Sequence, residues 1–402
     1  MRKTVCPALS SLITTTLASF FGCANGPPEL PPIPDNPSGS FLAVASTDFS
    51  SGALHTIDLA NLTVRKNVDM LDAQPVVRAY GSKLYALDQT HGAMRVYDVT
   101  ADFAGPRDYP VEKNPEVPAA QANPYDIYID TPRNVAYVTL YGSFGATAIT
   151  GGEALAVIDL ADPAAGIARF VPLPVATGDT DNNPDATRLI GCDDKLLVLL
   201  QDLDRMNGYV PAGPGRMAVV NLANPSDVQI IQLAGQNPTA LAVLPGCAQA
   251  IVGSAGNQLT GSLSGQAGIE LVDLKNLQTQ GLKLTDTTLK GNVSTLDAAS
   301  SRDVFVAISS KSGSTYNNDV YVVDAVSGTI SQKLLGPMSF VPGLRAVSGR
   351  IVVLSAGTPK PGQLKAGLYI GPATGVALPT EPVVLDSGAP AQAPISADLY
   401  VR

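Results

Sequence analysis

The amino-acid sequence predicts an all-β fold, on the evidence of its composition and of a strand pattern that recurs along the chain. The 402 residues include 37 Gly and 32 Pro, and 15% of them are charged. Gly and Pro are excluded from helix interiors, and helix surfaces are rich in charged residues, so this composition disfavours a helical protein. The hydrophobic fraction of 45% is ample for a core and disfavours disorder.

The recurring element is a short strand that ends in Asp or Asn. Six clear copies and a degenerate seventh, Leu368–Gly371, are spaced 40–62 residues apart. The six are Leu54–Asp58, Met94–Asp98, Leu155–Asp159, Met217–Asn221, Ile269–Asp273 and Val320–Asp324. Each follows a strand such as Val135–Thr139, and before that comes a further strand that usually begins at Pro. Repeats of this length with four strands each predict the blades of a β-propeller.

The two ends of the repeat region are complementary. Phe41–Ser46 matches the second strand of a unit, and Ile395–Val401 follows Pro394 as a first strand that lacks a second. Joining them completes one blade and removes two exposed sheet edges. The sequence therefore predicts a single seven-bladed β-propeller over residues 40–402, closed by pairing of the N- and C-terminal strands. Six or eight blades are the alternatives, because long insertions blur the count.

A leader and a tether are expected before the propeller. A basic start, a moderately apolar stretch and a small residue directly before Cys23 follow the order of an export signal. The last feature resembles a bacterial lipobox, although Phe20 departs from it, and an ordinary cleaved signal peptide is the alternative. Residues 23–39 are rich in Pro, which favours an extended tether. We expect a lipoprotein signal peptide over residues 1–22 and a lipid anchor at Cys23 in the bacterial envelope, at the outer membrane.

The repeat unit resembles the YVTN-type β-propeller repeat of the surface-layer and quinoprotein-like group. Residues 123–140 carry the resemblance best, with Asn123-Pro124 at their start and Tyr137-Val138-Thr139 near their end. The resemblance covers about residues 40–402. It implies a propeller fold and a bacterial lipoprotein, but a fold shared by many functions does not name a ligand.

Charge and histidine content restrict the function. The net charge is −9 and no stretch concentrates Lys or Arg, which disfavours nucleic-acid binding. The two histidines are His55, inside a predicted strand, and His91, in a predicted loop; so few limit general-base chemistry. We therefore expect a binding or scaffold module with a protein or glycan partner. The alternative is a calcium-dependent hydrolase or lactonase-like enzyme, which would gather three or more acidic or amide side chains in the central channel.

The expected binding face is the end of the ring that carries the long connections between second and third strands. These connections span residues 142–152, 202–215 and 253–268. The links to the next inner strand lie at the same end, whereas the opposite turns are tighter. Long loops on a rigid scaffold commonly carry function, although the same loops could be tolerated insertions.

One loop places side-chain oxygens at alternate positions, as the start of a Ca²⁺ loop does. The residues are Asp179, Asp181, Asn183 and Asp185. Pro184 occupies the usual Gly position and Ile190 stands where a bidentate Glu would follow, so the loop is not an EF-hand. Carbonyl groups or a neighbouring loop, through Asp202 or Asp204, could complete a Ca²⁺ site. The alternative is a solvated Asp/Asn turn.

The cysteines predict one disulfide bond. Cys6 leaves with the leader and Cys23 carries the lipid, so Cys192 and Cys247 remain in the exported protein. Both lie in the turn after an inner strand, in adjacent units. An oxidising compartment favours a bond between them, and two buried free thiols are the alternative.

Overall fold

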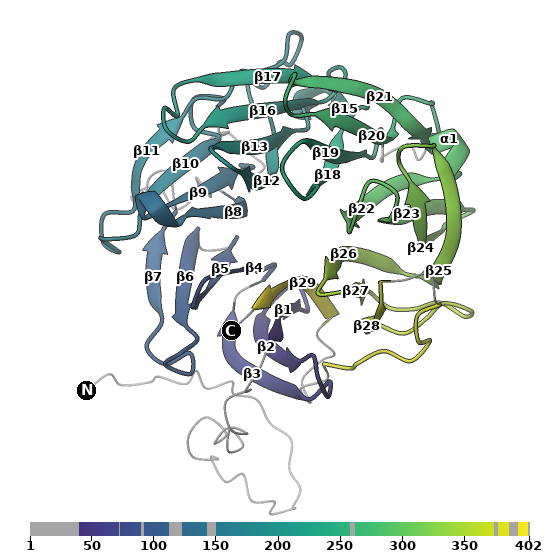
Figure 1. Cartoon of the computed structure of the whole chain (residues 1–402), viewed down its shortest axis with the longest axis horizontal. Coiled ribbons are helices and arrows are strands. Elements are labelled where there is room, and N and C mark those ends of the chain that lie inside the picture. Colours follow the sequence, from purple (N-terminus) through teal and green to yellow (C-terminus); the bar gives the residue numbers. More distant parts are fainter. Residues whose placement is uncertain are drawn as a thin grey trace, which may run out of the picture. The chain divides into compact units, whose positions relative to one another are not determined.

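Seven sheets are arranged in a ring around a central channel (Figure 1), and the described strands form one further, two-stranded sheet within a connection. The structure is a computed structural model, and it describes residues 40–71, 73–89, 92–111, 123–142, 150–257, 262–373, 377–385 and 393–400. The expected leader (1–22) and tether (23–39) lie outside these residues. We call the seven sheets of the ring blades 1 to 7. Within the described residues, blades 1 to 6 have four antiparallel strands and blade 7 has three.

Strands are given from the channel outward. Blade 1 consists of β29 (Ala393–Tyr400), β1 (Phe41–Thr47), β2 (Gly52–Asp58) and β3 (Val64–Leu71). Blade 2 consists of β4 (Val76–Tyr80), β5 (Lys83–Asp88), β6 (Ala93–Asp98) and β7 (Arg107–Pro110). Blade 3 consists of β8 (Pro124–Asp130), β9 (Val135–Leu140), β10 (Leu155–Asp159) and β11 (Ile167–Val171). Blade 4 consists of β12 (Ala186–Cys192), β13 (Lys195–Leu200), β16 (Arg216–Asn221) and β17 (Val228–Gln232).

The remaining elements follow the same pattern. Blade 5 consists of β18 (Pro238–Val243), β19 (Gln249–Ser254), β20 (Gly268–Asp273) and β21 (Gln278–Thr285). Blade 6 consists of β22 (Asn292–Ala298), β23 (Val304–Ser312), β24 (Thr315–Asp324) and β25 (Thr329–Met338), and blade 7 of β26 (Phe340–Val347), β27 (Arg350–Ala356) and β28 (Gly367–Pro372). The short elements are β14 (Leu203–Asp204), β15 (Val210–Pro211), η1 (Thr131–Arg133), η2 (Arg205–Asn207) and α1 (Asp286–Leu289). In the described part of the chain, the helices are too short and polar to cross a membrane.

The predicted repeat is the third strand of each blade. All six clear copies end at the predicted Asp or Asn. In each of them the side-chain Oδ1 accepts a hydrogen bond from the backbone N–H two residues later, as from Ala60 to Asp58 at 2.7 Å and from Val326 to Asp324 at 2.8 Å. Such turns reverse the chain toward the fourth strand. The repeated Asp is therefore a turn-forming residue.

Closure of the ring by the two ends of the chain is confirmed. β1 pairs with β29 in antiparallel register, with Phe41 opposite Tyr400. The rings of these two residues stack with centroids 4.7 Å apart. Because the pairing places β29 innermost in blade 1, no open sheet edge is left between the first and last strands (Figure 1).

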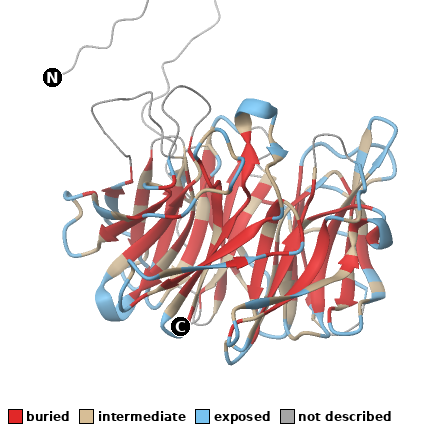
Figure 2. Cartoon of the chain, turned by 90° about the horizontal axis from the view of Figure 1, so that it is seen from above, coloured by how far each residue is buried: buried red, intermediate tan, exposed pale blue. Residues whose placement is uncertain are grey.

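The hydrophobic core lies between neighbouring blades. Buried residues follow the strands, while exposed residues gather in the connections at the two ends (Figure 2). One core cluster joins Leu87 of blade 2, Tyr137 of blade 3 and Leu196 of blade 4. Burial of each side chain of this size stabilises the fold by about 1.5–3 kcal/mol. Each blade is thus held chiefly by its two neighbours.

The predicted disulfide bond is present. Cys192 ends β12 and Cys247 lies in the turn between β18 and β19, and their sulfur atoms are bonded with the Cα atoms 5.6 Å apart. This Cα separation is typical of a disulfide bond. The bond connects blades 4 and 5 at the end of the ring opposite the long loops.

His55 lies in strand β2 of blade 1 and is buried as a neutral side chain. Its imidazole is fully buried, with Nε2 at 2.7 Å from Ser46 Oγ, while the Asn67 N–H donates to Nδ1 at 3.3 Å. An N–H donated to Nδ1 leaves the proton on Nε2. Burial, assisted by nearby Lys66, lowers the pKa of His55 to about 4.

We predict that His55 makes folding stability fall as the pH is lowered from about 6.5 to about 4. Between these pH values the His55 side chain binds a proton in the unfolded chain but not in the folded protein, where its pKa is about 4. The loss reaches about 2–3 kcal/mol near pH 4.5. Denaturant unfolding of the wild type and of His55→Gln at several pH values measures it. Since other titrating groups are common to both proteins, equal pH slopes would contradict the assignment.

Candidate functional site

Three inner strands carry an Asp that binds the backbone of the next inner strand. Asp398 Oδ2 of β29 accepts the N–H of Ala79 at 2.8 Å. Asp126 Oδ2 of β8 accepts that of Leu189 at 3.4 Å. The third link follows the same pattern, from the Ala346 N–H to Asp297 Oδ2 at 2.9 Å. We call these three hydrogen bonds the Asp latches.

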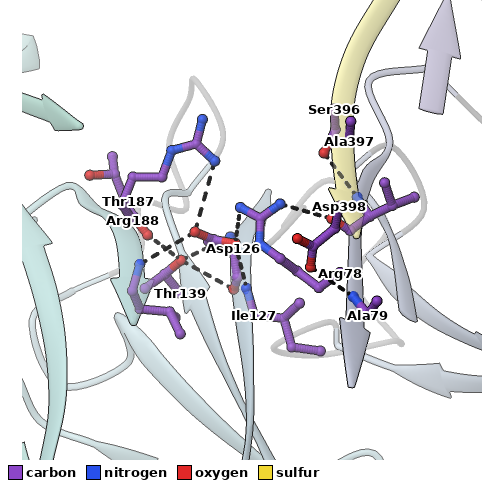
Figure 3. A network of polar contacts seen from close by, with 12 residues as sticks. Arg78, Ala79, Asp126, Ile127, Thr139, Thr187, Arg188, Ser396, Ala397 and Asp398 are labelled. Atoms are coloured by element: carbon purple, nitrogen blue, oxygen red, sulfur yellow. Dashed lines mark hydrogen bonds and ion pairs between the residues drawn. The ribbon is translucent and has the colours of Figure 1, made fainter. Parts of the chain in front are cut away.

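Each latched N–H is immediately preceded in sequence by an Arg. The three are Arg78, Arg188 and Arg345. Arg78 lies 2.7 Å from Asp126 Oδ1, whereas Arg188 approaches the other oxygen of the same carboxylate only to 3.8 Å. Arg345 lies 3.9 Å from Asp398 Oδ1. Figure 3 shows Arg78 and Arg188 converging on Asp126 from opposite sides.

Burial governs the electrostatics of these groups. It lowers the pKa of Arg78, and Asp126 opposes this shift. Burial acts in the same direction on Arg345, but Asp398, Asp297 and Asp126 outweigh it, so its pKa is raised. The pKa of Asp297 is raised by burial against the opposing effect of Arg345. Desolvated charges of this kind are stable only when paired, so the inner strands need their oppositely charged neighbours.

The inner strands carry three carboxylates, but each is engaged at its own junction between blades, and they are not among the described acidic residues that gather within metal-ligand distance of one another. Asp126 is 2% exposed and accepts hydrogen bonds from the N–H groups of Ile127 and Leu189 in addition to its contact with Arg78. The small cavity beside it has a volume of about 60 Å³, which is room for a few water molecules. These carboxylates connect the inner strands of neighbouring blades.

A wider cavity, which we call the funnel, opens from the channel toward the long-loop end. Its volume is about 460 Å³, within the usual range of small-ligand sites. Its walls include Phe49, Phe340, Tyr125, Tyr141 and Gln201, and Arg188 lines both the funnel and the smaller cavity below it. The funnel thus has aromatic and amide walls over a cationic floor, on the face that the sequence favoured for binding.

The long connections are described in part. Residues 202–215 form the β14–β15 hairpin and η2. Residues 143–149 of the connection 142–152 and residues 258–261 of the connection 253–268 lie outside the described residues, as does His91. Gln201 and Leu203, at the start of the described connection, line the funnel.

The loop with alternating oxygen side chains folds through successive turns. The Asp181 N–H donates to Asp179 Oδ1 at 3.1 Å, the Asn183 N–H to Asp181 Oδ1 at 2.8 Å, and the Asp185 N–H to Asn183 Oδ1 at 3.0 Å. Asx residues commonly make such bonds to the backbone two residues on. Hydrogen bonds within the loop therefore explain the alternating Asp and Asn residues, whether or not an ion binds.

The structure brings together some of the predicted calcium ligands. Carboxylate oxygens of Asp179, Asp181 and Asp204 all lie within 4.8 Å of one another. Asp185 instead pairs with Arg205 and accepts the Leu203 N–H at 2.8 Å.

The other two candidates are also engaged in the fold. Asn183 is fully buried and donates to Tyr141 O at 3.0 Å. Asp202 pairs with Arg216. The cluster is therefore narrower than the loop pattern predicted.

Two carboxyl groups of this loop have pKa values close to neutral pH. Burial and the neighbouring Asp181 raise the pKa of Asp179 to about 6, and burial raises that of Asp185 to about 7 despite Arg205. Asp179 Oδ2 is buried and accepts no hydrogen bond from the described residues. A cation would favour ionised Asp179, so any affinity should rise with pH.

The calcium site stays a prediction, and thermal unfolding tests it. Calcium at millimolar concentration should raise the unfolding temperature by about a few degrees at pH 8 and less at pH 5.5. Asp179→Asn should abolish the rise while keeping the Oδ1 acceptor. The control is Asp162→Asn, at an exposed turn whose Oδ1 accepts the Ala164 N–H. A rise that persists in Asp179→Asn, or no rise at either pH, would refute the site.

Sequence reasoning missed the charged residues of the inner strands. They follow a visible pattern, in which an inner-strand Asp such as Asp126 is matched by an Arg such as Arg188 one unit later. Because the two lie in different repeats, about 60 residues apart in this example, their pairing emerges only when successive blades are aligned.

Comparisons with known proteins identify the fold. No protein-family model matches the chain, and no curated protein matches its sequence. A crystal structure of a protein from Lactobacillus plantarum is similar with a TM-score of 0.55 at 14% identity, covering 90% of this chain and 99% of that one. A functionally unknown protein from Desulfotomaculum acetoxidans gives 0.51 at 10% identity, covering 84% and 94%. Apo AztD from Citrobacter koseri gives 0.46 at 13% identity, covering 90% and 98%.

The first two likenesses, whose TM-scores exceed 0.5, show the fold alone, because sequence identity is low and folds of this class host many functions. Together with the seven sheets and the terminal closure, they define the protein as a seven-bladed β-propeller.

Proposed function

We propose that this protein is a binding module of the bacterial envelope, which takes its ligand into the funnel on the long-loop face. The observation that carries the proposal is the funnel itself, a cavity of about 460 Å³ at the end of the central channel. Its size and its mixed aromatic and polar walls are those of ligand sites. A rigid ring of blades holds it open.

Exposed aromatic side chains at the funnel support this proposal. Phe49 is 62% exposed and Phe340 is 45% exposed, and both line the funnel. Large apolar side chains grouped around a cavity and left in contact with water are typical of interaction sites. They stabilise the bound state by leaving water when a partner arrives.

The position of His55 supports binding over acid–base catalysis. Its side chain is buried in blade 1 between Ser46 and Asn67 and lines neither cavity of the channel. A neutral imidazole with its pKa near 4 is a poor general base at neutral pH.

The proposed setting is the outer membrane, periplasmic or surface side. It rests on the sequence: a lipoprotein leader over residues 1–22, a lipid on Cys23, a tether over residues 23–39 and the resemblance to YVTN-type propellers. A lipid anchor with an extended tether would keep the funnel near the envelope while allowing it to turn toward a partner.

Cys23→Ala should release the protein from the membrane fraction of a producing bacterium. The substitution removes the thiol that would carry the lipid, so the mature protein should appear in the soluble exported fraction. Fractionation followed by immunoblotting measures the change, with Cys192→Ala as a control that leaves Cys23 intact. Retention of Cys23→Ala in the membrane would refute the anchor.

Loss of the exposed aromatic side chains should weaken envelope binding. In the full-length Cys23→Ala background, Phe49→Ala with Phe340→Ala should reduce cosedimentation with purified envelope fragments by about tenfold or more. The matched control is Val326→Ala, in an exposed turn at the opposite end of the ring and 49% exposed. Equal cosedimentation of all three proteins would refute the funnel as the binding site.

A calcium-dependent hydrolase is the second candidate. The observation that favours it is the Asp179, Asp181 and Asp204 cluster, because Leu203, directly before Asp204, lines the funnel. An ion there would lie beside a bound ligand and could polarise a carbonyl group. Calcium-dependent turnover of a lactone or ester, abolished by Asp181→Asn, would favour the enzyme.

A further inference from the structure

We propose that the ligand of the funnel is a carboxylate-bearing saccharide, a uronate, whose carboxylate binds the Arg188 guanidinium. This inference rests on the proposed function, since it names the ligand class of the same face. It is argued from the charge of the funnel, its walls and the bonding state of the inner strands.

Among the described residues, Arg188 is the channel arginine that lines the funnel, whereas Arg78 and Arg345 line the smaller cavity. Its side chain is 27% exposed, against 9% for Arg78 and 26% for Arg345, whose Nε donates to Ala397 O at 3.2 Å. The carboxylate it faces, Asp126, already contacts Arg78 at 2.7 Å, and Arg188 stands 3.8 Å away, beyond hydrogen-bond length. Its guanidinium lies over the Tyr125 ring at 5.5 Å from the centroid. A planar fork held in place at a cavity floor suits two parallel hydrogen bonds to a carboxylate.

The charge of the funnel favours a singly charged anionic group at Arg188. Among the described residues that line it, Arg188 is the charged one. A phosphate group carries up to two negative charges and is commonly met by several cations or by a helix N-terminus. One guanidinium, partly offset by Asp126, matches a single carboxylate better.

The walls favour a ring that is apolar on its faces and rich in hydroxyl groups at its edges. Tyr125 and Tyr141 lie side by side with centroids 5.6 Å apart and offer surfaces for the C–H face of a sugar. Gln74, Gln89 and Gln201 also line the funnel. Each amide can both donate to and accept from a hydroxyl group. A uronate combines such a ring with a carboxylate in one molecule.

A peptide carboxyl terminus fits less well. Extended peptides gain much of their affinity by pairing with free strand edges. Around Arg188 and Arg78 the inner-strand N–H groups are already bonded, Leu189 to Asp126, Ala79 to Asp398 and Val77 to Ser396 Oγ. Recognition in the funnel must therefore come from side chains.

Calorimetric titration of the full-length Cys23→Ala protein tests the inference. The probes are digalacturonate, its neutral counterpart galactobiose, and one tripeptide with a free or an amidated carboxyl terminus. Digalacturonate should bind at least tenfold more tightly than galactobiose. Arg188→Gln should weaken digalacturonate binding by about ten- to a hundredfold, whereas Arg302→Gln, at an exposed turn on the opposite end, should leave it unchanged. Arg188→Lys, which keeps the charge without the fork, should fall between.

Three results would overturn the inference: equal affinity for the acidic and neutral disaccharides, unchanged binding in Arg188→Gln, or Arg188-dependent binding of the free-acid tripeptide without binding of digalacturonate. Unfolding temperatures of each variant show whether a loss reflects misfolding, and Arg188→Lys supplies the test if Arg188→Gln does not fold. If envelope binding still depends on Phe49 and Phe340 while digalacturonate does not bind, the proposed function stands and the uronate fails.

Discussion

The propeller depends on satisfying the backbone N–H groups of its inner strands. Each inner strand is the edge of its sheet and faces a narrow channel, where an unbonded N–H costs about 1–3 kcal/mol. In three blades the solution is an Asp latch, in which a carboxylate such as Asp398 accepts the N–H of Ala79 on the next strand at 2.8 Å. The carboxylate must itself be neutralised after burial, and an Arg beside the latched residue supplies the opposite charge.

These contacts form a chain around most of the ring. It runs through Asp297 to Ala346, Arg345 to Asp398, Asp398 to Ala79, Arg78 to Asp126, and Asp126 to Leu189. The chain thus joins blade 6 to blade 4 by way of blades 7, 1, 2 and 3. The two remaining junctions use other means, the Cys192–Cys247 bond between blades 4 and 5 and a hydrogen bond from Thr239 Oγ1 to Val293 O at 3.3 Å between blades 5 and 6. The disulfide bond therefore begins at blade 4, the blade at which the series of charged contacts ends.

Sequence reasoning was reliable where an interaction is local or where the repeat pattern itself reveals it. The terminal Asp of each third strand bonds to its own turn, so its spacing predicted the blades, and the complementary ends predicted the β1–β29 pairing. The Asp179–Asp185 loop shows the limit of the same reasoning. Its alternation reflects turns that bond to the backbone, so Asn183 and Asp185 do not join the cluster, whereas Asp204 of the neighbouring loop, which the sequence offered as one of two completing residues, does. The funnel could not be predicted from the sequence because residues from every part of the ring line it, among them Phe49, Arg188 and Phe340.

The end of the ionic chain also explains why the channel can bind a ligand at one place. Within the chain Arg78 lies 2.7 Å from Asp126 and Arg345 lies 3.9 Å from Asp398, and neither is among the residues that line the funnel. At its end, Arg188 shares Asp126 with Arg78 and stands at the longer distance, so an incoming carboxylate has to break only the weaker contact. Because blades on either side are fixed by a latch and by a disulfide bond, the guanidinium is positioned before the ligand arrives. Affinity gained in this way comes from preorganisation of the site, and it requires the ring to be closed.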